Sequence, residues 1–232
     1  MFKFLKEKLK GAISKFTKKV EIEAKVEEPV KEGIEQKEEV PKREIKEISA
    51  ENSDTVVSFG EQLSAFIISE AIKNRDVSCE FVDSRKIIKT DNNFGEANVD
   101  IESSYKLISN YLKSKKTLYV MGGFIGSTHE GATTTLGRGG SDYTASLVGA
   151  ALDASVVEIW TDVDGLMTAD PRVAKNAVTI PQISYEEAEK MANAGAKVIH
   201  PKTMQPAREK SIPIYIKNTF NPKGNYTKIC QK

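Results

Sequence analysis

The residues best suited to chemistry in this 232-residue chain lie in one short stretch, TTTLGRGGSDYTASLVGAAL, at positions 133–152. Gly139 and Gly140 allow positive backbone φ angles and a close approach of a ligand to the main chain. Their N–H groups, with those of the helix that follows, favour an anion. Arg138 has a planar guanidinium that can pair with a carboxylate or a phosphate. The stretch therefore predicts a binding site for an acidic ligand at the start of a helix.

Two further residues of this turn leave two interpretations open. Ser141 adds a hydroxyl, whereas Asp142 would repel a phosphate unless it holds a lysine, a metal or a reacting proton. The simpler interpretation is a helix N-terminus, in which the glycines form the turn and Asp142 complements the helix dipole. The preceding TTTLGR and a second acidic turn downstream favour the ligand-binding interpretation.

The second acidic turn is WTDVDGLMTADPR, residues 160–172. The apolar segment VVEIW at 156–160 predicts a strand that ends at Thr161 and Asp162, and Asp164 with Gly165 forms a turn signal. Small polar side chains at a strand end, followed by Arg172, suit the base, ribose and phosphates of a nucleotide. A calcium loop of the EF-hand type is excluded, because the glutamate required at its end is not present.

Two glycine-rich patterns resemble phosphate-binding loops but lack a required residue. GSTHEGA, at 126–132, has the glycine spacing of a P-loop, but Ala132 stands where the phosphate-binding lysine is needed. GRGGSD fails the dinucleotide pattern G-x-G-x-x-G, because Asp142 occupies the third glycine position. A P-loop protein and a Rossmann hydride-transfer enzyme are therefore not supported.

The elements that must position these turns alternate along the chain. Periodicity predicts helices over 57–72, 101–114, 141–154 and 184–196, and strands over 79–83, 117–124, 156–160 and 212–218. The alternation predicts an α/β domain with a mainly parallel sheet covered on both sides. Ligands of such sheets bind beyond the carboxyl ends of the strands, where both turns lie.

The same patterns predict which side chains face the core. In the first helix these are Leu63, Phe66, Ile67 and Ala71. In the second they are Ile101, Tyr105, Ile108 and Leu112. The apolar strand at 156–160 is expected to be buried on both faces.

Composition excludes several classes of protein. The chain is 39% hydrophobic and 29% charged, with a formal net charge of +1, so it lacks the basic excess typical of nucleic-acid binding. Cys79 and Cys230 have neither the number nor the spacing of a disulfide framework or a zinc site, and no metal-binding residues are predicted. No segment has the length of a membrane span or the apolar core of a signal peptide. We therefore expect a cytoplasmic protein.

The N-terminal residues differ from the rest. Residues 1–20 place apolar side chains at steps of three and four among lysines, which predicts a basic amphipathic helix. Such a helix either makes a peripheral contact with an anionic membrane surface or docks on its own domain. Residues 21–53 are rich in Glu and Lys and predict a linker, followed by the α/β domain at 54–232. In composition this leader is weakly similar to the N-terminus of archaeal signal-recognition-particle receptors.

Residues 54–229 resemble the catalytic domain of aspartate kinases, which belong to the amino-acid kinase superfamily. The resemblance rests on consecutive motifs: SFGEQLSA, NFGEANVD, GFIGS, TTTLGRGGSDYTA, WTDVDGLMTADPR, GAKVIHPKTMQPA and IPIYIKNTFNP. It implies a three-layer α/β/α sandwich around a mainly parallel sheet. It also implies phosphorylation of the β-carboxylate of L-aspartate by ATP and Mg²⁺, a step of lysine, threonine and methionine biosynthesis. It leaves the formation of a homodimer open.

The resemblance also assigns roles to individual residues. It implies that Glu61 receives the α-amino group of aspartate and that Arg138, assisted by Ser141, pairs with a carboxylate of aspartate. Asp142 would order the reacting centre, and Lys197 would stabilise charge on the transferring phosphoryl group. The implied nucleotide contacts are Gly139, Gly140, Thr161, Asp162, Met167, Arg172, Lys197 and Val198. The Mg²⁺ ion would be bound mainly through the phosphates. Met167 replaces a tyrosine of some members, so only an apolar contact persists there, and His129 and His200 have no catalytic counterpart.

One motif of the family has no counterpart. Aspartate kinases begin with a strand that carries Lys-x-Gly-Gly-Thr/Ser-Ser, and nothing in residues 1–53 matches it. The regulatory ACT domains that usually follow are not found before Lys232. We therefore expect a partial kinase domain with little or no turnover. The alternatives are a non-catalytic nucleotide- or amino-acid-binding module tethered to a membrane and a kinase acting on glutamate or uridylate. TTTLGRGGSDYTA together with Glu61 favours aspartate.

Overall fold

A computed structural model of the protein describes residues 48–113, 117–169, 173–195 and 198–231. The predicted amphipathic helix at 1–20 and nearly all of the predicted linker lie outside these residues. Two of the predicted site residues, Arg172 and Lys197, also lie outside them. What the sequence predicts for these positions stays a prediction.

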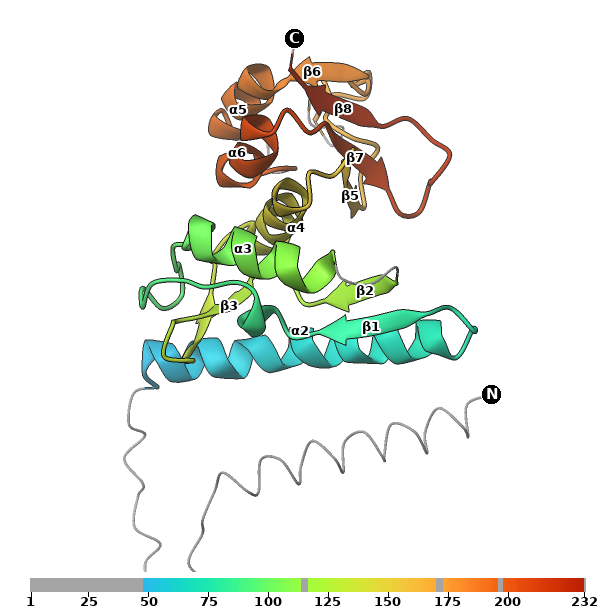
Figure 1. Ribbon diagram of the computed structural model, residues 1–232. Coiled ribbons are helices and arrows are strands. Elements are labelled where there is room, and N and C mark those ends of the chain that lie inside the picture. The colour runs from blue at the N-terminus through green and yellow to red at the C-terminus, as the bar shows by residue number, and fades with distance from the viewer. Residues whose placement is uncertain (1–47, 114–116, 170–172, 196–197, 232) are drawn as a thin grey trace, which may run out of the picture. The chain divides into compact units, whose positions relative to one another are not determined.

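Helices and strands alternate through the described residues, which confirms the α/β class (Figure 1). The helices are α2 (Ala50–Lys73), the 3-10 helix η1 (Ser84–Lys86), α3 (Ile101–Leu112), α4 (Gly140–Ala151), α5 (Tyr185–Asn193) and α6 (Pro201–Glu209). The strands are β1 (Cys79–Val82), β2 (Leu118–Met121), β3 (Ile125–Ser127), β4 (Thr133–Thr135), β5 (Val157–Thr161), β6 (Gln182–Ser184), β7 (Ile214–Asn218) and β8 (Thr227–Cys230). The helices η1 and α6 and the strands β3, β4, β6 and β8 were not predicted from the sequence.

The described strands form three sheets. Strands β1 and β2 pair in parallel, and β3 and β4 form an antiparallel hairpin. The third sheet has the order β5-β7-β8-β6, in which β7 and β8 are antiparallel and the other two pairs are parallel. Among the described strands, β2 pairs only with β1 and β5 only with β7, so the expected mainly parallel sheet is divided at this point.

The four-stranded sheet buries one of its faces. Val157, Ile159, Ile214 and Ile216 form a core with apolar residues of α5 and α6. The alternate residues of β5 point the other way, and Trp160 is 44% exposed. The expectation that 156–160 is buried on both faces was therefore wrong, because side chains alternate between the faces of a strand. Lys217 places its Nζ 4.5 Å from the centre of the Trp160 ring.

A second core lies between α3, α4 and the residues after β1. Its buried members are Val82, Ile87, Ile88, Ile108, Leu112 and Ala151. Of the four residues that periodicity placed on the inner face of α3, Ile108 and Leu112 are buried and Tyr105 is partly buried. Ile101 is 37% exposed, because it is the first residue of the helix and lies at its end.

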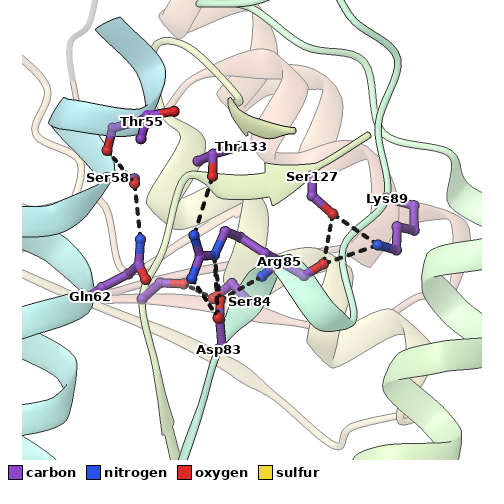
Figure 2. Close-up of polar contacts among 10 residues, drawn as sticks. Thr55, Ser58, Gln62, Asp83, Ser84, Arg85, Lys89, Ser127 and Thr133 are labelled. Carbon is purple, nitrogen blue, oxygen red and sulfur yellow. Dashed lines mark hydrogen bonds and ion pairs between the residues drawn. The ribbon is translucent and has the colours of Figure 1, made fainter. Parts of the chain in front are cut away.

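Helix α2 reverses the expected pattern of burial. Its buried residues are Asp54, Ser58, Gln62, Ala65 and Ser69. Of the four residues predicted to face the core, Leu63 is 39% exposed and Ala71 is exposed, whereas Phe66 and Ile67 are partly buried. Local hydrogen bonds make the polar inner face possible: Ser58 Oγ donates to the Thr55 carbonyl at 2.7 Å and accepts from Gln62 Nε2 at 2.9 Å (Figure 2).

Candidate functional site

The turn that precedes α4 needs glycine at two positions. Gly137 and Gly139 have φ angles of +71° and +72°, in the left-handed region that side chains rarely adopt. A Cβ atom on Gly139 would also lie 2.8 Å from Cβ of His200. Gly140 begins α4 without positive φ, but a Cβ there would lie 2.5 Å from Cβ of Phe124. Positive φ angles and steric crowding together explain why this turn has glycine at positions 137, 139 and 140.

A cavity of about 630 Å³ opens beside this turn. Arg138, Gly139 and Asp142 line it on the side of α4, and Val198 and His200 line it on the side of α6. His200 is the N-cap of α6, and its Nδ1 accepts from the Lys202 N–H at 3.3 Å. Four of the predicted site residues therefore meet at one cavity, together with a histidine for which the sequence indicated no catalytic role.

Asp142 is the titratable group of this cavity with a shifted pKa. Burial raises the pKa of its carboxyl above the ordinary value for aspartate. A partly buried carboxylate is stabilised by a nearby cation, because the attraction offsets the lost hydration. The position therefore suits a group that meets a cation when a ligand binds.

Glu61 lies near the cavity but is not among its lining residues. Its Oε1 accepts a hydrogen bond from the Gly123 N–H at 2.9 Å, directly after β2. A Cβ atom on Gly123 would lie 2.7 Å from Cα of Ser141, so the segment that Glu61 contacts packs against the first turn of α4. The structure thus brings both Glu61 and Ser141 next to Gly123.

Three further predicted nucleotide contacts, Thr161, Asp162 and Met167, lie at the end of β5 or in the segment that follows it. Thr161 Oγ1 donates to Asp162 Oδ1 at 3.2 Å, and Met167 forms a backbone bridge with Thr179. Asp164 Oδ1 accepts from Asn218 Nδ2 at 2.8 Å and so connects the ends of β5 and β7. Thr161, Asp162 and Met167 do not line the cavity beside Arg138.

Sequence reasoning missed one buried carboxylate. Asp54 is 4% exposed, and its two oxygens accept three hydrogen bonds from Gly95 and Thr135. In the sequence it lies four residues before SFGEQLSA begins. An aspartate in the first turns of a helix is usually exposed, so the sequence does not indicate that Asp54 is buried. Its burial follows from the reversed inner face of α2, which apolar periodicity does not predict.

The described part of the chain was also searched for metal-binding clusters and for membrane-spanning helices. No three His, Cys, Asp or Glu side chains within it lie close enough together to hold a metal ion. Its helices include none that is both long enough and apolar enough to cross a membrane.

Comparisons with known proteins agree with the fold. The model of the amino acid kinase family matches residues 11–218, so the chain belongs to the amino acid kinase family. Among curated relatives, lysine-sensitive aspartokinase 3 of Escherichia coli K12 is 44% identical over 182 residues, which cover 78% of this chain and 40% of that protein. The aspartokinase of Chlamydia muridarum is 36% identical over 183 residues, or 79% of this chain and 42% of that protein.

Solved structures show the same relationship. E. coli aspartokinase III in complex with aspartate and ADP has a TM-score of 0.76 at 44% identity and covers 79% of this chain and 42% of its own. A UMP kinase from Ureaplasma parvum, at 17% identity and a TM-score of 0.54, covers 77% of this chain and 71% of its own and shares the fold alone. The resemblance to aspartate kinases and the amino-acid kinase fold are thus confirmed. The chain spans about two fifths of the length of the aspartokinases described here.

Proposed function

We propose that this chain is part of an aspartate kinase and that it binds L-aspartate and ATP. The proposal rests chiefly on one juxtaposition: Arg138 and Asp142 share a cavity, and Glu61 binds the N–H of Gly123, which packs against Ser141. An amino acid is a zwitterion, so its site needs a cation and an anion held a short distance apart. The identity with aspartokinases supports aspartate as the substrate over glutamate or uridylate.

Each polar residue has a distinct task in this proposal. The Arg138 guanidinium pairs with a carboxylate of aspartate, and the free acceptor capacity of Glu61 receives its α-amino group. The N–H groups at the start of α4 and the side chains of Thr161 and Asp162 hold the nucleotide. Lys197 and Arg172, both outside the described residues, contribute positive charge near the phosphates.

The proposed reaction requires little proton chemistry from the protein. An oxygen of the substrate β-carboxylate forms a bond to the γ-phosphorus of ATP, the bond from that phosphorus to the β,γ-bridging oxygen breaks, and ADP leaves. The carboxylate is already deprotonated at neutral pH, so no general base is needed. The residues act by positioning two anions and by offsetting their charge. Mg²⁺ bound to the phosphates would neutralise further charge.

A non-catalytic binding module is the second candidate. The observation that favours it is the sequence itself, because none of the 232 residues form Lys-x-Gly-Gly. That lysine is implied to touch the phosphates in aspartate kinases. Without its charge the remaining residues can still bind both ligands, yet the transfer would be slow.

Calorimetric titration of the full chain distinguishes these proposals. We expect L-aspartate and ADP each to bind, and D-aspartate, L-glutamate and UMP to bind much more weakly. Hydroxylamine trapping of an acyl phosphate then separates a kinase from a binding module. Failure of both L-aspartate and ADP to bind would contradict the proposed function, and preferential binding of UMP would indicate a different kinase.

A further inference from the structure

We propose that Asp54 is a positioning residue that fixes the Gly137–Arg138 turn relative to Glu61. The inference rests on the proposed function, in which Arg138 and Glu61 hold the two ends of aspartate. Asp54 does not line the cavity. It acts on the site through the backbone of the two segments that it binds.

The hydrogen bonds of Asp54 join three parts of the chain. Asp54 lies in the first turns of α2. Its Oδ2 accepts from the Thr135 N–H at 2.8 Å and from the Gly95 N–H at 2.9 Å, and its Oδ1 accepts from Thr135 Oγ1 at 2.8 Å. A buried carboxylate with three such donors is held in one place, because loss of any donor leaves a desolvated charge unsatisfied.

Both segments that Asp54 binds lead directly to the turn. Thr135 ends β4, two residues before Gly137, and its carbonyl accepts from the Ala97 N–H at 2.9 Å. The Gly95 carbonyl oxygen lies 3.2 Å from the position that a Cβ on Gly137 would take. Asp54 therefore holds Thr135, two residues before Gly137, and Gly95, whose carbonyl lies close to Gly137, the neighbour of Arg138.

Strand β4 is anchored along its whole length by buried threonines. Thr133 Oγ1 accepts from the Arg85 guanidinium at 3.3 Å (Figure 2), and Thr134 Oγ1 shares a hydrogen bond of 2.7 Å with Thr90 Oγ1. Asp54 binds the last threonine, the one nearest to Arg138. Asp54 is the anchor that comes from α2.

Glu61 lies on the same helix, seven residues after Asp54, which places the two side chains about two turns apart. The helix is rigid over this distance, so Asp54 and Glu61 set a fixed spacing between the two proposed contacts of aspartate. The proposed nucleotide contacts Thr161 and Asp162 share no hydrogen bond with Asp54, although the N–H groups at the start of α4 follow the turn that it anchors. Loss of Asp54 should therefore affect aspartate more than nucleotide.

The test is calorimetric titration of the full chain with L-aspartate and with ADP. We expect Asp54→Asn to weaken aspartate binding by about tenfold or more, because a neutral amide loses the charge that strengthens all three hydrogen bonds and its NH2 group cannot accept from Thr135 Oγ1. ADP affinity should stay within about threefold of wild type. Thr135→Val should have a smaller effect of the same kind, and Thr135→Ser should restore wild-type affinity. Ser69→Ala, which removes a buried hydroxyl that bonds only the Phe66 carbonyl, is the matched control.

Hydrogen exchange makes the inference testable independently of the proposed function. Asp54→Asn should raise the exchange of the amides at 135–140 and of Gly95, and leave those of β5 and β7 unchanged; Ser69→Ala should change neither. If wild type binds no aspartate but this selective loosening occurs, the proposed function fails and the positioning role stands. Equal weakening of both ligands by folded Asp54→Asn, unchanged aspartate affinity, or uniform exchange would overturn the inference.

Discussion

Arg138 lies beside Gly139 and Asp142 in the cavity, and its side chain is exposed to solvent. If it pairs with the aspartate carboxylate, Arg138→Ala should weaken aspartate binding by about 1.5–3 kcal/mol, because the charge-assisted hydrogen bonds to the carboxylate are lost. Arg138→Lys should recover part of the loss, since it keeps the charge but not the planar pair of donors. ADP binding should change far less. Calorimetry that shows equal losses for the two ligands would refute this assignment.

Asp142 allows a test based on pH. Burial raises its pKa in the folded chain, so at a pH between the unfolded and folded pKa values the folded chain binds more protons. Its contribution to the free energy of unfolding is therefore present below the unfolded pKa and is lost as the pH rises through the folded pKa. Asp142→Asn should stabilise the chain at neutral pH and have little effect below the ordinary aspartate pKa of 3.8.

Chemical unfolding at several pH values measures this difference. Asp162→Asn removes an equal charge from an exposed position and serves as the control. The same change at Asp142 should lower any transfer activity, because functional groups are often kept at a cost in stability. A neutral-pH stability equal to wild type would show that Asp142 gains a compensating cation.

At the scale of elements, α2 presents an apolar surface to solvent. Val56, Val57, Phe59, Leu63 and Ile68 are each between 38% and 64% exposed. Surfaces of this kind promote self-association. Val57→Gln with Leu63→Gln should reduce dye binding and association at high concentration, and each change should alter the free energy of unfolding by no more than about 0.5 kcal/mol.

The control for this surface lies on the opposite face of the same helix. Ala65 is 5% exposed, so Ala65→Gln should destabilise the chain by about 1–3 kcal/mol through overpacking. Thermal unfolding and light scattering report the two effects separately. If the Val57 and Leu63 variant loses as much stability as the Ala65 variant, the outer face of α2 is packed.

The same helix shows what the sequence could and could not predict. Periodicity located α2, α3 and α4, and the motifs identified the turn at Arg138 and the family. The inner face of α2 was misassigned, because Ser58 and Gln62 form a hydrogen bond with each other and can therefore be buried. A search for apolar residues at helical spacing does not detect such a polar pair. Strands β4 and β6 have only three residues each, too few for a period to be recognised.

At the scale of the molecule, the prediction concerns turnover. We expect the 232-residue chain to form little aspartyl phosphate, about 10²–10³ slower than the same chain supplied with a Lys-x-Gly-Gly segment, because one preorganised cation at the phosphoryl group is lost. Strands β2 and β5 each have one edge that no described strand occupies, and a further parallel strand could pair there. A fused segment of this kind is the direct test.

The control for the fusion is a segment in which the lysine is replaced by methionine. It should restore pairing and stability but not turnover. Rapid formation of aspartyl phosphate by the unmodified chain would show that another of its cations, such as Lys197, already supplies the charge. Equal rates for the lysine and methionine segments would show that the strand, and not its charge, is what matters.

Trp160 has a practical consequence. It is the single tryptophan of the chain, it is partly exposed, and it lies one residue before Thr161 with a lysine ammonium over its ring. Its emission should therefore respond to any ligand that reorganises the end of β5. The protein carries its own optical reporter for one of its two proposed ligands, so nucleotide affinity can be read by fluorescence without a label.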